Sequence, residues 1–249
     1  MYQFFIEDEN EAEDFVTIEG SDVNHIKNVL RMKPGEKIRV CTRNGQNYFC
    51  SISDITESFV RADILEKEAE STELPCRIYL FQGLPKNDKM EWIIQKTVEL
   101  GVYEVIPVAM KNCVVKLDDK KAKSKVTRWQ AIAESAAKQS KRSLIPEVKM
   151  PMSYKEAVAY AKKLDVKLVP YENEHGMAGT KAAMEQIKKG ESIAVFIGPE
   201  GGFAPEEIAL VQDEMQLISL GKRILRTETA GIAALAILGY QLESSDMIE

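Results

Sequence analysis

The sequence is poor in the residues that build metal centres and disulfide frameworks. Its 249 residues include four cysteines, none of them in a CxxC pair, and two histidines, His25 and His175. Because a structural zinc site needs a denser set of such ligands, no metal is predicted. We expect the cysteines to be reduced. Neither histidine lies in a known catalytic motif, so we assign no catalytic role to either.

Long apolar runs are missing as well. The longest strictly nonpolar run, residues 230–240, has 11 residues, which is too short to cross a bilayer. The N-terminus passes directly into acidic residues, without the basic start of a signal peptide. We therefore expect a cytoplasmic protein with no membrane partner.

Three common ligand-binding signatures are also absent. The chain has no GxGxxG dinucleotide fingerprint, no GxxxxGK[ST] phosphate loop and no GxSxG nucleophile elbow. These absences argue against the nucleotide-binding folds and the serine hydrolases that depend on those motifs.

Positive charge is scarce overall but concentrated in two stretches. The formal net charge of −6 argues by itself against a nucleic-acid partner. Residues 111–142, however, contain ten basic and three acidic residues, a local charge of +7 that leaves −13 for the rest. In residues 27–43, six basic residues are opposed only by Glu36. Each patch alone is typical of a solvated surface, although such patches also bind phosphate groups.

The composition divides the chain into two domains. Residues 1–72 combine short strand candidates, one helix and a hairpin signal at Asn44-Gly45, which predicts a small β-barrel. A polar, acidic stretch at residues 66–75 forms the linker. Residues 73–249 alternate strands and helices, which predicts an α/β domain with a parallel sheet covered on both faces. Strands are expected at 77–81, 105–109, 166–169, 193–197 and 217–220, and helices at 90–100, 125–142, 154–163, 181–188, 205–215 and 228–242.

Two segments of the second domain run from an apolar strand into glycine. Residues 193–203 break at Gly198-Pro199, and residues 218–230 break at Gly221. Parallel sheets place their ligand sites at the edge where such strands end. One such loop alone is as often an ordinary strand-to-helix turn, but two close together favour a binding site. The run 230–240 is apolar on every face, which indicates either a partner subunit or a central core helix.

These segments carry a specific resemblance. Ile197–Gly202 (IGPEGG) and Leu220–Ala230 (LGKRILRTETA) resemble the signature of the SPOUT class of methyltransferases. More narrowly, the chain is similar to the RsmE family of ribosomal RNA (uracil-N3) methyltransferases. The similarity extends over essentially the whole chain, through His25–Arg31 (HIKNVLR), Leu84–Met90 (LPKNDKM), Gln95–Gly101 (QKTVELG), Arg128-Trp129 and Ala137–Arg142 (AKQSKR).

The resemblance implies a fold, a cofactor and a substrate. The N-terminal domain is expected to be a PUA-like RNA-binding barrel, and the second a SPOUT domain whose C-terminal segment forms a deep trefoil knot. The chain is expected to be a homodimer that uses S-adenosyl-L-methionine to methylate N3 of a uridine near the 3′ end of 16S rRNA, in the assembled small ribosomal subunit. The implied cofactor-binding residues are Phe196, Ile197, Gly198, Pro199, Glu200, Gly201, Leu220, Gly221, Ile224, Leu225, Arg226, Glu228, Thr229 and Ala230.

The charged residues near these loops are the candidates for chemistry. Removing the N3 proton of uracil calls for a base or for groups that stabilise the anion. Glu200 and Glu228 are the candidate bases, and Arg142 and Arg226 are the candidate stabilisers; Glu200 is equally well explained as a loop anchor. The expected RNA-contacting residues are Arg31, Arg43, Lys86, Arg128, Gln139 and Arg142.

One departure and two alternatives remain open at this point. Gln3 stands where the family usually has arginine, which puts one RNA contact in doubt. A related SPOUT enzyme would instead methylate a ribose 2′-oxygen. A non-catalytic ribosome-assembly factor would bind RNA without binding S-adenosylmethionine.

Overall fold

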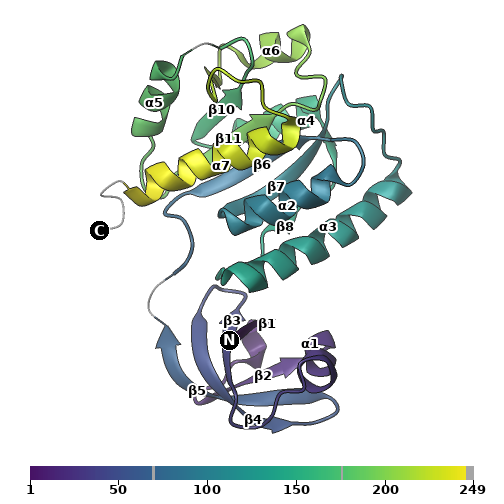
Figure 1. The fold of residues 1–249 in the computed structure, drawn as a ribbon, viewed down its shortest axis with the longest axis vertical. Coiled ribbons are helices and arrows are strands. Elements are labelled where there is room, and N and C mark those ends of the chain that lie inside the picture. The colour runs from purple at the N-terminus through teal and green to yellow at the C-terminus, as the bar shows by residue number, and fades with distance from the viewer. Residues whose placement is uncertain (69–70, 175, 245–249) are drawn as a thin grey trace. The chain divides into compact units, whose positions relative to one another are not determined.

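The structure is a computed structural model that describes residues 1–68, 71–174 and 176–244, and it forms two compact units (Figure 1). The N-terminal unit comprises Met1–Glu73 together with Ala137–Ile145. The second unit comprises Leu74–Ala136 and Pro146–Glu249. The sequence places a boundary close to the first break, but it gives no sign that a later segment belongs to the N-terminal unit.

The N-terminal unit is built on a five-stranded sheet in the order β1-β3-β4-β5-β2. β1 and β3 are parallel, whereas the other neighbours are antiparallel. The edge strands β1 and β2 contact each other, so the sheet curves round on itself, as in the predicted β-barrel. The elements are β1 (Tyr2–Ile6), a 3-10 helix η1 (Asp8–Asn10), β2 (Phe15–Glu19), α1 (Ser21–Asn24), a π-helix η2 (His25–Val29), β3 (Lys37–Thr42), β4 (Asn47–Ile55) and β5 (Phe59–Glu68).

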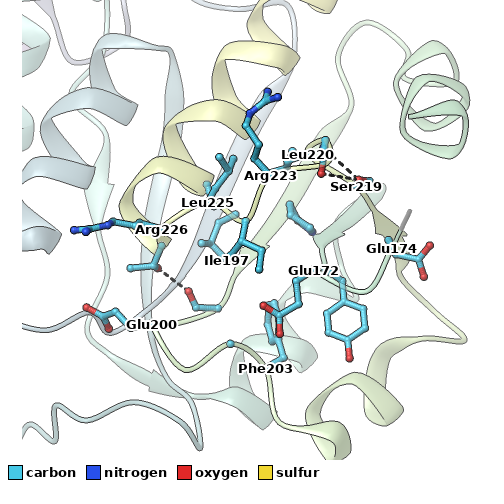
Figure 2. A pocket seen from close by; sticks show the side chains of 18 of the residues that line it. Glu172, Glu174, Ile197, Glu200, Phe203, Ser219, Leu220, Arg223, Leu225 and Arg226 are labelled. Atoms are coloured by element: carbon cyan, nitrogen blue, oxygen red, sulfur yellow. Dashed lines mark hydrogen bonds between the residues drawn. The ribbon is translucent and has the colours of Figure 1, made fainter. Parts of the chain in front are cut away.

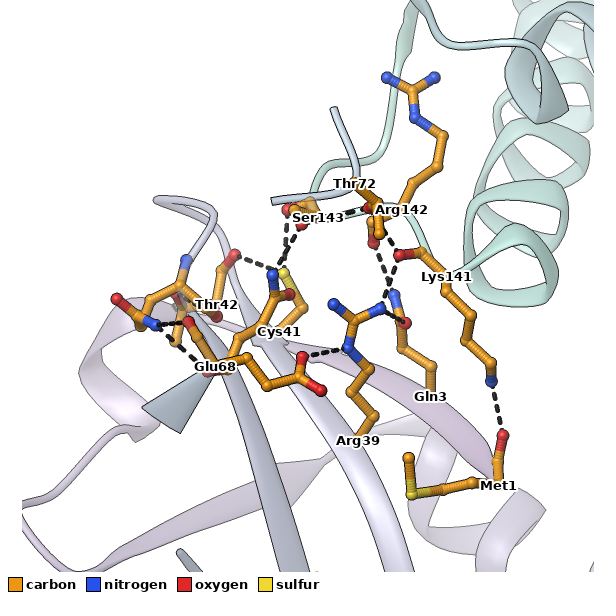
Figure 3. Close-up of polar contacts among 12 residues, drawn as sticks. Met1, Gln3, Arg39, Cys41, Thr42, Glu68, Thr72, Lys141, Arg142 and Ser143 are labelled. Carbon is orange, nitrogen blue, oxygen red and sulfur yellow. Dashed lines mark hydrogen bonds and ion pairs between the residues drawn. The ribbon is translucent and has the colours of Figure 1, made fainter. Parts of the chain in front are cut away.

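Strand β3 has both of its faces buried. Ile38 and Val40 point into the apolar core of the unit, as the period of two along a strand requires. Arg39 and Cys41 lie on the other face, yet they are only 6% and 0% exposed. Their cover is the segment Ala137–Ile145, because Arg39 Nη1 donates to the Lys141 carbonyl at 2.7 Å and Cys41 Sγ to the Ser143 carbonyl at 2.9 Å (Figure 3).

The second unit contains a seven-stranded parallel sheet. Its order is β12-β10-β11-β6-β7-β8, and β9 also pairs with β7. Its strands are β6 (Arg77–Gly83), β7 (Val102–Ala109), β8 (Glu147–Val148), β9 (Met152–Ser153), β10 (Val166–Pro170), β11 (Ser192–Ile197) and β12 (Gln216–Ile218). The helices are α2 (Lys89–Glu99), α3 (Asp119–Ser140), α4 (Tyr154–Ala161), α5 (Ala178–Glu185), α6 (Pro205–Val211) and α7 (Thr227–Ser244).

Alternating side chains give this sheet two packed faces. Phe81 of β6 stacks on Phe196 of β11, with centroids 4.4 Å apart and planes 4° apart, and α4 and α6 cover this apolar cluster. On the opposite face α2 and α7 pack against each other and against β6, β7 and β11 (Figure 1). The predicted α/β architecture with helices on both faces is thus confirmed.

The differences from prediction lie in short or polar elements. Helix α3 begins at Asp119, six residues before its predicted start. The prediction missed the first turns because they are lysine-rich and carry little apolar periodicity. Strands β8 and β9 have two residues each, which is too short for a sequence pattern. Helix α1 of the N-terminal unit continues directly as the π-helix η2, a local variation that residue spacing does not predict.

Candidate functional site

Three neighbouring strands end at one edge of the second sheet. β10 lies between β12 and β11, and all three are parallel. Their ends therefore bring three loops together: residues 171–174 after β10, 198–203 after β11, and 219–226 between β12 and α7. Carboxyl ends of parallel strands are the usual place for a ligand site.

The loops enclose a cavity of about 660 Å³ (Figure 2). Ten of the fourteen predicted cofactor residues line it: Ile197, Gly198, Pro199, Glu200, Leu220, Gly221, Ile224, Leu225, Arg226 and Ala230. Phe196, Gly201, Glu228 and Thr229 are not among the lining residues. Phe196 is fully buried, because its ring stacks on Phe81 within the core.

Sequence reasoning missed the third wall of the cavity. Pro170, Tyr171, Glu172 and Glu174 line it from the end of β10. The strand itself was predicted, but no motif indicates that β10 lies between the two glycine loops. The other lining residues that were not predicted as cofactor contacts are Lys89, Gly202, Phe203, Ser219, Lys222, Arg223 and Thr227.

Buried hydrogen bonds hold the β11 loop and α7 together. Thr227, the first residue of α7, donates to the Gly198 carbonyl at 2.6 Å and accepts from Gln82 Nε2 at 2.9 Å. A Cβ on Gly83 would lie 2.7 Å from the nitrogen of Pro199, which is closer than packed atoms tolerate. Glycine at position 83 therefore lets the end of β6 pass directly beneath the loop.

Two further side chains brace the glycine loops. Asn112 Nδ2 donates to the carbonyls of Gly201 and Gly202 at 3.0 and 3.2 Å. Thr180 Oγ1 donates to the Ser219 carbonyl at 2.8 Å and accepts from its N–H at 3.0 Å. The backbone that faces the cavity is consequently fixed from several elements before any ligand arrives.

A charged cluster lies at the rim of the cavity. Glu200 Oε1 accepts from the Lys86 N–H at 3.0 Å and from Lys89 Nζ at 3.1 Å, and the same Nζ lies 3.2 Å from Glu228 Oε2. Burial raises the pKa of Glu200, but the hydrogen bonds from Lys86 and Lys89 outweigh it, so the net pKa is lowered. Glu200 is therefore a stable anion and a weak base, which favours its role as a loop anchor.

The two predicted arginine stabilisers have opposite environments. Arg226 is exposed and lines the cavity, where its side chain extends toward the end that holds Glu200 (Figure 2). Arg142 is 3% exposed and lies in the N-terminal unit, where its guanidinium is paired with Glu73. The catalytic and RNA-binding roles predicted for Arg142 do not fit this environment, because its charge is already neutralised within the fold.

Gln3 also has a structural role. It is 4% exposed, donates to the Arg142 carbonyl at 2.6 Å and accepts from Arg39 Nη1 at 3.2 Å. A side chain so enclosed cannot reach an RNA surface. The departure at position 3 therefore bears on how the segment Ala137–Ile145 is held.

The other predicted RNA contacts are exposed and divided between the units. Arg31, Arg43 and Gln139 belong to the N-terminal unit, and Lys86 and Arg128 to the second. Arg43 pairs with Glu7 at 3.0 Å and Arg128 with Glu91 at 2.7 Å. His175 lies outside the described residues.

Neither a metal centre nor a membrane-spanning helix is found in the part of the chain that the structure describes. Within residues 1–68, 71–174 and 176–244, no group of three or more histidine, cysteine or acidic side chains is arranged to hold a metal ion. Over those same ranges, no helix combines the length and the apolarity needed to cross a membrane.

Sequence comparison gives this geometry a family. Residues 72–239 match the RNA methyltransferase domain family, and residues 18–65 match the RNA methyltransferase PUA domain family. Ribosomal RNA small subunit methyltransferase E of Bacillus subtilis is 38% identical, over 98% of each chain. The chain belongs to the ribosomal RNA small subunit methyltransferase E family.

Solved structures of related proteins agree with this placement. Ribosomal RNA small subunit methyltransferase E of Neisseria gonorrhoeae, solved with bound S-adenosylmethionine, is 32% identical with a TM-score of 0.81, over 96% of this chain and 97% of that one. A methyltransferase of Legionella pneumophila, also solved with this cofactor, is 31% identical with a TM-score of 0.82, over 95% and 96% of the two chains. The predicted resemblance to the methyltransferase E family is thereby confirmed, and so is the PUA-type class of the N-terminal domain.

Proposed function

We propose that this member of the methyltransferase E family transfers a methyl group from S-adenosyl-L-methionine to N3 of a uridine near the 3′ end of 16S rRNA, in the assembled small ribosomal subunit. The observation that carries the proposal is the cavity between the two glycine loops, at the position the resemblance gives to the cofactor. Relatives named for ribosomal RNA methylation and solved with this cofactor support it.

The cavity fits the cofactor by size and by lining. Its volume of about 660 Å³ lies in the range of roughly 300–1,000 Å³ that small-molecule sites occupy. Ile197, Leu220 and Leu225 offer apolar surface for an adenine ring. Backbone groups of the loops, held by Thr227, Thr180 and Asn112, offer fixed donors and acceptors for its polar edge.

The chain's own residues then have to deal with a proton. When bound, the cofactor supplies a sulfonium methyl group, whose transfer to N3 breaks the S–C bond, forms an N–C bond and requires the N3 proton to leave. Glu228, beside the cavity at the start of α7, is the better placed acceptor, because it shares the Lys89 contact with Glu200 but not the hydrogen bond from the Lys86 N–H that fixes Glu200. Arg226 is the group that would stabilise negative charge on the uracil.

We also propose an RNA-binding surface, a cellular location, a homodimer and a knotted C-terminal segment. We place the RNA on exposed residues of both units, namely the basic Arg31, Arg43, Lys86 and Arg128 and the amide Gln139. We place the enzyme in the cytoplasm, where ribosomal subunits are assembled. Two exposed apolar side chains, Tyr240 on α7 and Ile224 in the loop that precedes α7, are 75% and 87% accessible and support a homodimer. The C-terminal segment is the part expected to thread through an earlier loop and form the trefoil knot.

The decisive test is nucleoside analysis after methyl transfer. Purified protein is incubated with methyl-labelled S-adenosylmethionine and unmodified small subunits, with free 16S rRNA in parallel, and the digested RNA is examined by mass spectrometry. We expect 3-methyluridine at one position, formed with the subunit. A ribose-methylated nucleoside would replace the proposal with 2′-O methylation, and RNA binding without any affinity for the cofactor would replace it with an assembly factor.

A further inference from the structure

Three separate elements supply the charges at the rim of the cavity. Lys89 is the first residue of α2, Glu200 lies in the loop after β11, and Glu228 lies in the first turn of α7. The ammonium nitrogen of Lys89 is 3.1 Å from Glu200 Oε1 and 3.2 Å from Glu228 Oε2. The side chains are 28%, 23% and 17% exposed, respectively, so the contacts are shielded from most of the solvent.

The backbone before α2 is shaped to make this arrangement. Asn87 adopts a left-handed conformation with φ of 56°, which asparagine tolerates better than most residues. This turn follows Lys86, whose N–H donates to the same Glu200 oxygen that Lys89 contacts. Residues 86–89 thus deliver two donors to one carboxylate oxygen, and Lys89 extends the contact to a second carboxylate.

The lysine separates two like charges. Hydrogen bonding to Glu200 raises the pKa of Lys89, so the ammonium form is favoured. Without the Lys89 ammonium group, the neighbouring carboxylates of Glu200 and Glu228 would repel each other, and one of them would take up a proton more readily. The other charged side chains that line the cavity are Glu172, Glu174, Lys222, Arg223 and Arg226. Asp88, next to Lys89 in the sequence, lies 3.6 Å from Lys125.

We propose that Lys89 is a positioning residue for methyl transfer, which holds the carboxylates of Glu200 and Glu228 in fixed positions at the cavity. This inference rests on the proposed function. Lys89 acts through the two carboxylates, and no contact of its own with the reacting atoms is invoked. One ammonium group thereby links the α2, β11-loop and α7 walls of the site.

The kinetic test compares two replacements with a matched control. Lys89→Met keeps the aliphatic stem but removes the charge, Lys89→Arg keeps the charge, and Lys96→Met removes a lysine of the same helix that pairs with Glu99. We expect Lys89→Met to lower kcat about 10- to 100-fold while KM for small subunits and the calorimetric Kd for S-adenosylmethionine change less than about threefold. Lys89→Arg should restore most of the rate, and Lys96→Met should match wild type.

The pH dependence separates positioning from simple structural support. We expect the acid limb of the kcat profile to move upward by about one pH unit or more in Lys89→Met, since one carboxylate then holds a proton more strongly. Carbon-13 NMR titration of labelled glutamate carboxyls should give the same shift at Glu200 or Glu228, whether or not the protein methylates RNA.

Different failures have different meanings. A wild-type protein without methyl transfer would refute the proposed function, while the carboxyl titration would still test Lys89. If Lys89→Met weakened cofactor binding alone, or left both the kcat profile and the carboxyl titration unchanged, the positioning role would be wrong. A melting temperature for each variant identifies any loss that comes from unfolding.

Discussion

The cavity of the second unit and the segment Ala137–Ile145 of the N-terminal unit each contain an arginine that was predicted to stabilise the uracil anion, but the two arginines have opposite environments. At the cavity, Arg226 is exposed and the loops around it are held by buried hydroxyl and amide groups. In the N-terminal unit, Arg142 is buried against Glu73, and its neighbours Lys141 and Ser143 are bonded to β3. The charge of Arg226 is thus available to a ligand, whereas the charge of Arg142 is neutralised by Glu73 within the fold.

Whether an arginine is buried or exposed therefore indicates better than its residue type whether it stabilises the fold or is available to a ligand. Both arginines lie beside basic or glycine-rich motifs, and both were predicted to be catalytic on that ground. Of these two, only Arg226 lines the cavity in the structure, and Arg142 lies in the N-terminal unit. Variants of the two regions should accordingly fail in different ways: loss of stability in the segment, and loss of cofactor binding or turnover at the cavity.

The largest effect is expected from Arg142→Met. Removing one partner of a buried ion pair leaves Glu73 without its counter-charge and typically costs about 3–5 kcal/mol. Chemical denaturation followed by circular dichroism measures the loss. The matched control is Arg43→Met in the same unit, whose partner Glu7 and own side chain are 58% and 52% exposed, and whose removal should cost less than about 1 kcal/mol. Equal losses in the two variants would contradict the distinction.

Gly83→Ala should have the next largest effect, this time on the cavity. The new methyl group would meet the nitrogen and Cδ of Pro199 at 2.7 and 2.8 Å, so the loop after β11 must move. Overpacking of this kind costs about 1–3 kcal/mol, and we expect at least about tenfold weaker binding of S-adenosylmethionine by calorimetry. Gly239→Ala is the control, since a Cβ there meets nothing within 4 Å. Wild-type affinity in Gly83→Ala would show that the close approach is unimportant.

The smallest expected effect is on the pH dependence of stability, through the cysteines inside the two units. Burial raises the pKa of Cys41 and of Cys50 to about 12, and it also raises that of Cys76 and Cys113. Unfolded thiols ionise near pH 8.5, so the unfolded state loses protons first and stability should fall as the pH rises above about 8.5. Native protein at pH 8 should resist iodoacetamide. Fast alkylation of Cys41 would indicate that the cover over β3 opens.

The sequence predicts most of the fold and part of the site. Alternation of apolar runs in residues 76–242 gives the α/β architecture, because each buried strand and helix is long enough to repeat its period. The resemblance locates the two glycine loops. The β10 wall of the cavity was missed, since Tyr171 and Glu172 lie in no motif and strand order is a tertiary property.

The misassignment of Arg142 has a related physical cause. A helical pattern places Arg142 on a basic face with Arg128, but the helix ends at Ser140 and Lys141 turns with φ of 63°. Arg142 then leaves the helical face and pairs with Glu73, which lies 69 residues earlier in the chain. Such a long-range partner cannot be inferred from local spacing.

Hydrogen–deuterium exchange with and without S-adenosylmethionine tests the central contrast most directly, because it examines both regions in one unmodified protein. We expect the cofactor to slow amide exchange in residues 198–203 and 219–226, and to leave exchange in residues 137–145 unchanged. No protection of the two loops, or protection confined to residues 137–145, would contradict it.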